Sequence, residues 1–254
     1  MIITIFNQKG GCGKTTTVLT LGSILAEMNK RVLILDLDPQ SNTTAGVGIK
    51  NVTDKNTYDL LKSSKLMHDE VTSFITKTDF QNLYCIPSDV SLSNAEITLS
   101  NVICRESILK KIIKHIDRDF DFILIDTPPS LGLLSINSLT AADYLIIPTN
   151  ANYFCVKGIE DVISTYQLVK TNLNNNLDIG VLITMFNGNI NLSKSIKANL
   201  HEAFGDKLFD TIIRQDCKIQ YSQDAQKPLA YYNKKCNGYK DYYDFTMEVL
   251  NYGK

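Results

Sequence analysis

A glycine-rich loop directly follows a β-branched, apolar segment at the start of the chain. Residues 2–6 (IITIF) predict a buried strand. The next residues read Asn7-Gln8-Lys9-Gly10-Gly11-Cys12-Gly13-Lys14-Thr15-Thr16. They match the phosphate-binding pattern GxxxxGK[ST] except at its first position, where Gln8 replaces glycine. A strand that feeds such a loop and then a helix constrains the chain to an α/β fold with a phosphate site close to the N-terminus.

The chemistry of this loop survives the missing glycine. Gly10, Gly11 and Gly13 let the backbone take positive φ and turn its N–H groups inward around a phosphate. Lys14 should reach the β- and γ-phosphates, and the Thr15 hydroxyl should supply one ligand to Mg²⁺. The residues expected to hold the nucleotide are Lys9, Gly10, Gly11, Cys12, Gly13, Lys14, Thr15 and Thr16. The sequence therefore predicts a P-loop nucleoside triphosphatase.

Carboxylates end two further predicted strands. Residues 31–35 lead into Asp36 and Asp38, and residues 122–125 lead into Asp126. In a parallel sheet, the carboxyl ends of the strands lie at the edge where ligands bind. An aspartate at the end of an apolar strand can hold Mg²⁺ through water, which makes Asp126 a metal candidate. Hydrolysis also needs a polar group beyond the γ-phosphate that orients water, and Asp38 is the candidate for that task.

Short β-branched runs alternate with amphipathic helical stretches along the whole chain. Strands are predicted at residues 2–6, 31–35, 83–86, 122–125, 144–147, 179–184 and 208–213. Helices are predicted at residues 15–28, 96–116, 158–173, 193–204 and 239–250, with a helical fragment at residues 58–61. We therefore expect a doubly wound, mostly parallel sheet with helices on both faces, formed by residues 1–254 as a single P-loop domain.

Charge and cysteine usage limit the location and the partners of the chain. Twenty-six Lys and Arg against 27 Asp and Glu give a net charge of −1, so contact with nucleic acid or a membrane would need a local patch. The six cysteines are scattered and have no metal-ligand spacing, which predicts free thiols in a reducing cytoplasm. No apolar run approaches the roughly 20 residues that cross a bilayer. No charged leader precedes the first strand, so secretion is not expected.

Three segments resemble motifs of the ParA/MinD family of ATPases. Residues 9–15 read KGGCGKT, and a lysine just before the glycines is similar to the family's deviant Walker A loop. Residues 36–42 read DLDPQSN and resemble the family's switch I, with Ser41 in place of the usual glycine. We expect Ser41 only to stiffen that turn. Residues 126–130, DTPPS, resemble switch II, and the resemblance extends over nearly the whole chain.

The resemblance implies a switch ATPase that dimerises around ATP and uses Mg²⁺. It implies that Lys9 crosses the interface of a nucleotide-sandwiched homodimer and touches the phosphates of the partner subunit, much as an arginine finger does. It implies that Asp38 positions or activates the attacking water, and that Asp36 supports the Mg²⁺ shell. The catalytic set is then Lys9, Lys14 and Asp38, and the metal set is Thr15, Asp36 and Asp126.

Features outside the site separate the members of the family. No cysteine follows Asp126 or a nearby glycine loop, whereas nitrogenase iron protein needs one to bridge its cluster. MinD-type proteins end in a basic amphipathic helix that lies on the membrane, but residues 239–250 carry acidic residues at their polar positions, so no membrane contact is expected. Small ParA/Soj proteins begin at the P-loop strand, as this chain does. The resemblance therefore implies a ParA/Soj-type partition ATPase.

Membership of that group would bring a set of partners. It implies nonspecific binding of double-stranded DNA by the ATP dimer, slow hydrolysis stimulated by a ParB-like centromere-binding protein, and a cytoplasmic protein associated with the nucleoid when ATP-bound. The cargo would be a plasmid or a chromosome. The candidate DNA contacts are Lys194, Lys197, Lys234 and Lys235.

Two departures from the family pattern leave alternatives open. Small members carry an arginine just after the strand that corresponds to residues 179–185, and residues 186–192 (FNGNINL) contain none. A MinD-like or protein-cargo positioning ATPase that does not bind DNA is therefore the alternative. Arg214 stands where the adenine segment of the family usually has proline, so no base contacts are assigned.

Overall fold

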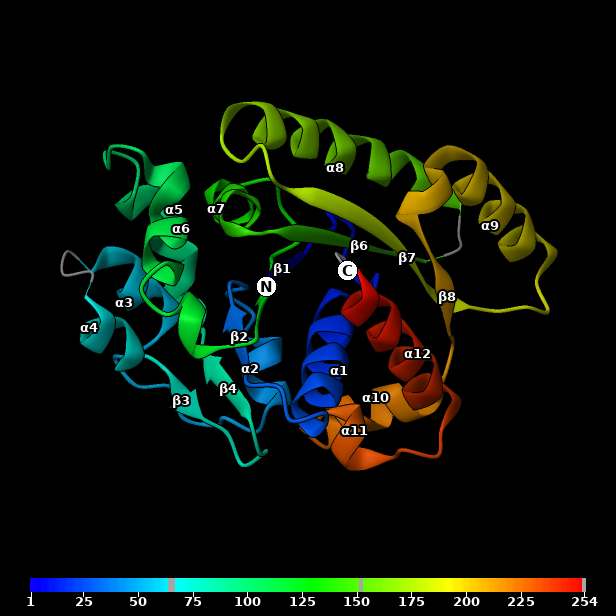
Figure 1. The fold of residues 1–254 in the computed structure, drawn as a ribbon, viewed down its shortest axis with the longest axis horizontal. Helices are drawn as coiled ribbons and strands as arrows, with labels where there is room; N and C mark the ends of the chain where they lie inside the picture. Colours follow the sequence, from blue (N-terminus) through cyan, green and yellow to red (C-terminus); the bar gives the residue numbers. More distant parts are fainter. Residues whose placement is uncertain (64–66, 151–152, 253–254) are drawn as a thin grey trace.

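The protein is organised around one eight-stranded sheet (Figure 1). The computed structural model describes residues 1–63, 67–150 and 153–252, with the backbone alone for residues 153–158. The strands lie in the order β3-β4-β2-β5-β1-β6-β7-β8. Every adjacent pair is parallel except β3 and β4. The predicted α/β fold with a mostly parallel sheet is confirmed.

All of the predicted strands are present, and the last three strands in the chain are longer than predicted. The strands are β1 (Ile2–Ile5), β2 (Val32–Asp36), β3 (Thr76–Lys77), β4 (Leu83–Ile86), β5 (Phe122–Asp126), β6 (Tyr144–Asn150), β7 (Asp178–Phe186) and β8 (Leu208–Arg214). The unpredicted strand, β3, is a two-residue edge strand that offers no hydrophobic alternation to detect. Because β1 lies between β5 and β6, the loop after β1 opens at the middle of the sheet.

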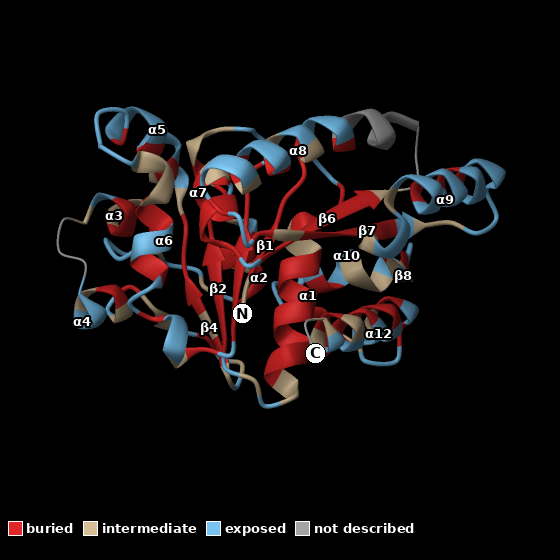
Figure 2. Cartoon of the chain, turned by 45° about the horizontal axis from the view of Figure 1, so that its top comes forward, coloured by how far each residue is buried: buried red, intermediate tan, exposed pale blue. Residues whose placement is uncertain are grey.

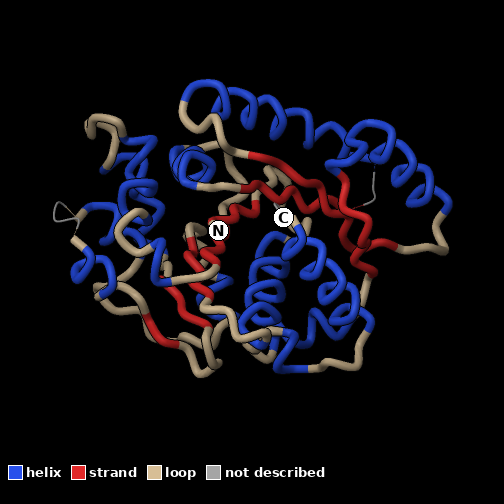
Figure 3. The backbone as a smooth tube through the Cα atoms, viewed as in Figure 1, coloured by secondary structure: helices blue, strands red, loops and turns tan. Residues whose placement is uncertain are grey.

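Helices cover both faces of the sheet (Figure 3). The helices are α1 (Lys14–Glu27), α2 (Asn42–Gly46), α3 (Thr57–Lys62), α4 (His68–Thr72), α5 (Ala95–Thr98), α6 (Ile108–Ile113), α7 (Leu133–Ala141), α8 (Tyr153–Asn172), α9 (Asn191–Phe204), α10 (Cys217–Asp224), α11 (Leu229–Tyr232) and α12 (Asn237–Asn251). Short 3₁₀ helices are η1 (Val90–Asn94), η2 (Arg105–Ser107), η3 (Asp117–Asp119) and η4 (Gly205–Lys207).

The core lies on both sides of the central strands. Ile34 packs into the cluster that contains the apolar residues of α1 and α12. Its neighbours Leu33 and Leu35 pack into a separate cluster with α6 and α7. Figure 2 shows the central strands and α1 as the buried centre of the molecule. A strand that is buried on both faces is what a continuous apolar run in a parallel sheet predicts.

The prediction of a single helix at residues 96–116 is wrong. The chain forms α5, η2 and α6 there instead. Cys104 takes a left-handed backbone conformation with φ 56°, which interrupts the helical path. Asn137 of α7 then accepts the N–H of Leu109 at 3.0 Å and donates to the carbonyl of Arg105 at 2.8 Å. A side chain from another helix therefore sets where α6 begins, which the local apolar spacing does not reveal.

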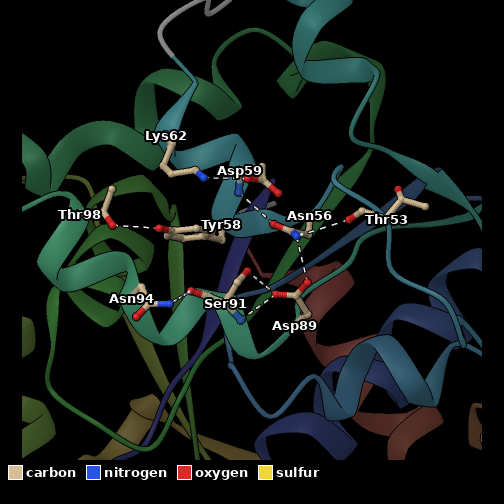
Figure 4. A network of polar contacts seen from close by, with 9 residues as sticks. All are labelled: Thr53, Asn56, Tyr58, Asp59, Lys62, Asp89, Ser91, Asn94 and Thr98. Atoms are coloured by element: carbon tan, nitrogen blue, oxygen red, sulfur yellow. Dashed lines mark hydrogen bonds and ion pairs between the residues drawn. The ribbon is translucent and has the colours of Figure 1, made fainter.

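A polar network ties α3 to the segment that leads into α5 (Figure 4). Asn56 caps α3 by accepting the N–H of Asp59 at 2.9 Å, and its Nδ2 donates to Asp89 Oδ2 at 3.1 Å. The next residue, Thr57, donates its hydroxyl to the carbonyl of Asp36 at 2.8 Å. The network thus anchors the region beside the carboxyl end of β2.

The C-terminal helix packs against the body of the protein. Tyr242, Phe245 and Val249 of α12 are buried in the cluster shared with α1, and α12 also contacts β8. Within the described ranges, no helix combines the length and the apolar character that a membrane crossing needs. The cysteines whose side chains are described are free thiols, and the side chain of Cys155 lies outside the described residues.

Candidate functional site

The glycine-rich loop connects the carboxyl end of β1 to the first turn of α1. Gly11 and Gly13 have φ angles of 70° and 94°, which residues with a side chain rarely adopt. Gly10 lies outside the positive-φ region, so the expectation of positive φ is wrong for that glycine. A Cβ added at Gly10 or Gly11 would meet no atom within 4 Å. The loop therefore presents its backbone to an open space, as a phosphate cradle must.

Lys14 lies across the loop with its ammonium group turned inward. Its side chain is 8% exposed, and Nζ donates to the carbonyl oxygen of Lys9 at 3.2 Å. The same carbonyl accepts the Sγ–H of Cys12 at 3.2 Å. Among the described residues, no side chain caps the amino end of α1 and no acidic residue lies in its first turn. Its N–H groups and positive end are therefore available to an anion.

Asp126 ends β5 next to the P-loop and accepts two hydroxyl groups on one oxygen. Thr15 Oγ1 donates to Asp126 Oδ2 at 2.7 Å, and Thr43 Oγ1 donates to the same atom at 2.6 Å. Asp126 is fully buried, and its Oδ1 has no hydrogen-bond partner among the described residues. A buried carboxylate oxygen without a partner is costly, and a cation would relieve that cost. The structure therefore brings Thr15 and Asp126 together and adds Thr43, which sequence reasoning missed.

Asp36 ends β2 directly beside Asp126, in register across the two strands. Its Oδ1 accepts the N–H of Asp38 at 3.0 Å. Its Oδ2 accepts the N–H and the hydroxyl of Thr44 at 2.9 and 2.7 Å. These bonds use both oxygens of Asp36 to fix the following turn. Asp126 and Thr15 are left as the pair best placed to contact a cation.

The turn after β2 holds Asp38 close to this pair. Asp38 is 9% exposed, and its Oδ1 accepts the N–H of Gln40 at 2.9 Å. Ser41 takes φ 50°, in the left-handed region that favours glycine. That conformation costs a residue with a side chain about 1 kcal/mol. Ser41 therefore adds strain to the turn, which goes beyond the stiffening expected from its sequence.

Burial raises the pKa of both strand-end carboxylates. The pKa of Asp36 rises to about 7, because burial and then the negative charge of Asp126 disfavour its ionised form. The pKa of Asp126 rises to about 6 through burial, with a further contribution from the charge of Asp38, while the threonine hydroxyl groups oppose the rise. Two adjacent buried carboxylates with this property form a site that a divalent cation would stabilise.

The donor set fits Mg²⁺ in the company of a phosphate group. Mg²⁺ prefers oxygen ligands and usually keeps several waters beside one or two carboxylates and substrate phosphates. In the parts of the chain that the structure describes, no three His, Cys, Asp or Glu side chains are grouped as metal ligands. The hydroxyl of Thr15 and the unpartnered oxygen of Asp126 are oxygen donors that suit Mg²⁺ bound together with phosphate and water.

A pocket of about 80 Å³ opens at the ends of β7 and β8, beside the P-loop. Its lining residues are Gly13, Thr16, Thr184, Met185, Ile213, Arg214, Gln215, Asp216, Ile219, Gln220 and Tyr242. Thr184 Oγ1 donates to the carbonyl of Cys12 at 2.8 Å, which ties β7 to the loop. Asp241 holds Arg214 by accepting its Nη2 and Nε at 2.6 and 2.9 Å. Gly13 and Thr16 are among the lining residues, so the pocket adjoins the P-loop.

Comparison with known proteins places this site in a family. A family model described as an AAA domain matches residues 1–179. The chain is 39% identical over 254 residues to the sporulation initiation inhibitor protein Soj of Bacillus subtilis, with 99% of each chain covered. It is 35% identical to the chromosome partitioning protein ParA of Caulobacter vibrioides, over 98% of this chain and 94% of that protein. The chain belongs to the ParA/Soj family of partition ATPases.

Solved structures agree with membership of the ParA/Soj family. A putative plasmid partition protein of Borrelia burgdorferi, bound to AMPPNP, matches with a TM-score of 0.82 and 27% identity over 98% of both chains. Cobyrinic acid a,c-diamide synthase of Mycobacterium smegmatis, with a bound ATP analogue and magnesium, matches with a TM-score of 0.84 and 28% identity, over 100% of this chain and 96% of that one. The fold of the ParA/Soj family thus serves proteins of different tasks, and the site alone does not distinguish them.

The four lysines predicted to contact DNA lie on two separate parts of this ParA/Soj-family protein. Lys194 and Lys197 are exposed on α9. Lys234 and Lys235 lie between α11 and α12, and Figure 1 shows α9 and α11 well apart. Lys234 Nζ forms an ion pair with Glu27 Oε1 at 2.6 Å. The predicted lysines therefore do not form one patch, and one of them already has an acidic partner.

The buried carboxylates of the ParA/Soj-family site should make the stability of the nucleotide-free protein depend on pH. A raised pKa means that the native state binds more protons than the unfolded state between about pH 4 and 7, so the free energy of unfolding falls as the pH rises through that range. Asp126→Asn removes one carboxylate and the charge that acts on Asp36. From about pH 4 to 7, we expect the free energy of unfolding to fall by roughly 2–3 kcal/mol more in the wild type than in Asp126→Asn.

Urea unfolding without nucleotide or metal, at several pH values, measures this difference. Asp117→Asn, which removes an exposed carboxylate, is the matched control and should follow the wild type. If the free energy of unfolding changed with pH equally in the wild type and in Asp126→Asn, Asp36 and Asp126 would not have the raised pKa values described above.

Proposed function

We propose that this chain binds ATP with Mg²⁺ at the P-loop and hydrolyses it slowly, with residues 1–254 acting as one ATPase domain. The observation that carries the proposal is the donation of both Thr15 and Thr43 to Asp126 Oδ2, at 2.7 and 2.6 Å. One carboxylate thereby joins the P-loop, the helix α2 that follows the switch I-like segment, and the end of β5. The ATP analogues and the magnesium bound by the two solved neighbours support the same ligands here.

In this proposal, the P-loop and the strand ends hold the nucleotide and the metal. The N–H groups of residues 10–16 face the phosphates, and Lys14 supplies positive charge beside them. Bound Mg²⁺ would neutralise phosphate charge, held by the Thr15 hydroxyl and by Asp126. Asp36 fixes the turn next to the metal through its bonds with Thr44.

Two further residues take part in hydrolysis and in assembly. Asp38 orients the attacking water, because positioning and electrostatics supply most of the catalysis of phosphoryl transfer. Its buried position and its bond to the N–H of Gln40 at 2.9 Å support a fixed orientation. Lys9 reaches the phosphates of the partner subunit in a homodimer that forms on ATP binding, where it stabilises developing charge.

The dimer is proposed to bind double-stranded DNA without sequence preference. A ParB-like centromere-binding protein stimulates hydrolysis and releases the dimer, and the cargo is a plasmid or a chromosome. The protein would then be cytoplasmic and associated with the nucleoid in its ATP-bound form. The names of its relatives, which include the chromosome partitioning protein ParA, support this role.

DNA retention with ATP, with ADP and without nucleotide tests the DNA step. We expect retention with ATP alone, weakening as salt rises, because phosphate contacts release counterions. Replacing Lys194 and Lys197 together by alanine should make the plot of log affinity against log salt less steep by about 4, because the dimer contains each lysine twice and each phosphate contact contributes about 0.9. Lys234→Ala should change the slope less, because Glu27 already neutralises that ammonium group.

The matched control for the double variant is the replacement of Lys110 and Lys111, exposed on α6, by alanine. It removes the same charge and should leave the slope unchanged. An equal fall of the slope in the control would mean that net charge, and not a DNA contact on α9, causes the effect.

The second candidate function is ATP-dependent positioning of a protein cargo without DNA binding. The segment 186–192 has no arginine, and the candidate lysines are divided between two surfaces, which favours this alternative. Absence of DNA retention at low salt, in a protein that still binds and hydrolyses ATP, would select it.

A further inference from the structure

A glutamine outside every motif contacts the P-loop helix. Gln223 of α10 donates Nε2–H to Thr16 Oγ1 at 2.7 Å, across 207 positions of the chain. Thr16 is the second residue after Lys14 in α1. Gln223 lies near the end of α10 and is exposed. The bond joins two side chains and satisfies no backbone group of either helix, so capping of a helix does not explain it.

The bond lies next to the pocket described above, because its acceptor Thr16 lines that pocket. Thr16 and Gly13 line that pocket from the P-loop, and Ile219 and Gln220 line it from α10. Gln223 follows these two at helical spacings of four and three, so it lies on the same face of α10. Thr16 therefore lies between the pocket at one end and the Thr15 contact with Asp126 at the other.

The direction of this hydrogen bond fixes the role of the Thr16 hydroxyl. A threonine hydroxyl has one hydrogen to donate and two lone pairs that accept. Because Gln223 donates, the oxygen of Thr16 is the acceptor and its hydrogen points elsewhere. Within the described residues, Thr16 Oγ1 donates no hydrogen bond. The hydroxyl is thus prepared to donate to an anion.

We propose that Gln223 is a positioning residue for the nucleotide, and that it orients the Thr16 hydroxyl to donate to the α-phosphate. The proposal rests on ATP binding at the P-loop as proposed above. A nucleotide with its base in the pocket and its terminal phosphates at Lys14 must carry its α-phosphate past Thr16. ADP and ATP share that phosphate, so Gln223 acts equally on both and has no part in the hydrolytic step.

Gln223→Ala and Gln223→Glu separate this role from a general contact between helices. Titration calorimetry with ADP and with ATP should show that Gln223→Ala weakens both by about 3- to 10-fold, the worth of one hydrogen bond. Gln223→Glu should weaken both by more than about 10-fold, because a carboxylate accepts the Thr16 hydrogen and repels the phosphate. The rate at saturating ATP should stay unchanged while KM rises, since the contact is uniform between ground state and transition state.

The matched control is Gln167→Glu, the same change at an exposed position of α8. It should bind both nucleotides as the wild type does. Gln223→Ala should also keep the unfolding temperature of the nucleotide-free protein, which separates lost positioning from lost stability.

A double-mutant cycle with Thr16→Ala completes the test. If Gln223 acts through the Thr16 hydroxyl, Gln223→Ala should have no further effect on ADP affinity in the Thr16→Ala background. A full effect in that background, or wild-type affinity of Gln223→Glu, would overturn the proposal while leaving ATP binding intact. A wild-type protein that binds neither nucleotide would instead overturn the proposed function, and the role of Gln223 with it.

Discussion

An Asp38→Ala variant is expected to bind ATP about as tightly as the wild type and to hydrolyse it at least about 100-fold more slowly. Asp38 is buried at the turn after β2, and its carboxylate is oriented by the N–H of Gln40. Removing the group that orients water raises the barrier to hydrolysis but removes no phosphate contact. Phosphate release under single-turnover conditions, beside equilibrium binding of ATP, measures the two effects separately.

Because hydrolysis is blocked, Asp38→Ala should also accumulate the ATP-bound dimer. Asp54→Ala, which removes an exposed carboxylate from the loop after α2, is the matched control and should turn over ATP at the wild-type rate. Wild-type turnover in Asp38→Ala would remove Asp38 from the catalytic set and leave the source of water orientation elsewhere.

Replacing Lys9 by alanine or glutamine is expected to weaken ATP-dependent dimerisation by about 30-fold or more. A symmetric dimer contains the contact twice, so the loss counts at both phosphate sites. The backbone of Lys9 also shapes the loop, since its carbonyl accepts Lys14 Nζ at 3.2 Å and its N–H donates to Asn7 Oδ1 at 3.0 Å. These backbone bonds do not depend on the side chain, so ATP binding by the monomer should persist.

Sedimentation with ATP over a range of protein concentrations gives the dimer affinity of each Lys9 variant. Lys9→Arg keeps the charge and should retain part of the affinity, and Lys77→Ala, at an exposed position on β3, should behave as the wild type. A dimer of normal strength in Lys9→Ala would refute a contact between Lys9 and the partner subunit.

The sheet could be predicted from the sequence because its strands are buried on both faces. Residues 122–125 and, apart from Arg31, residues 31–35 are apolar, and an aspartate follows each run, so that signal is local. The helix predicted at residues 96–116 failed because its interruption is not local. Asn137, 28 positions after Leu109, captures the N–H of that residue and sets the start of α6.

The candidate site could be predicted only where its residues follow a strand or a glycine-rich loop. Thr15 and Asp126 meet as expected, because the P-loop and the end of β5 both lie at the carboxyl edge of the sheet. Thr43 and Thr44 could not be predicted as site residues, because their bonds to Asp126 and Asp36 depend on how the short helix α2 packs against the ends of β5 and β2. Gln223 is even harder to predict from the sequence, because its contact with Thr16 depends on where the fold places α10 relative to α1.

Charge on the surface was the least predictable feature. Lys234 and Lys235 form a basic pair in the sequence. The fold brings Glu27, at the end of α1, within 2.6 Å of the Lys234 ammonium group. Counting basic residues along the chain cannot reveal such a partner, because ion pairs between distant segments form only in three dimensions.

The mass of the wild-type protein in solution, measured with Mg²⁺ and ATP, with Mg²⁺ and ADP, and without nucleotide, tests most directly whether this site is a switch that ATP closes. We predict a mass of twice the monomer with ATP and of one monomer in the other two conditions, with the doubled mass persisting longest in Asp38→Ala. The same mass in all three conditions, in a protein that demonstrably binds ATP, would contradict an ATP-dependent dimer.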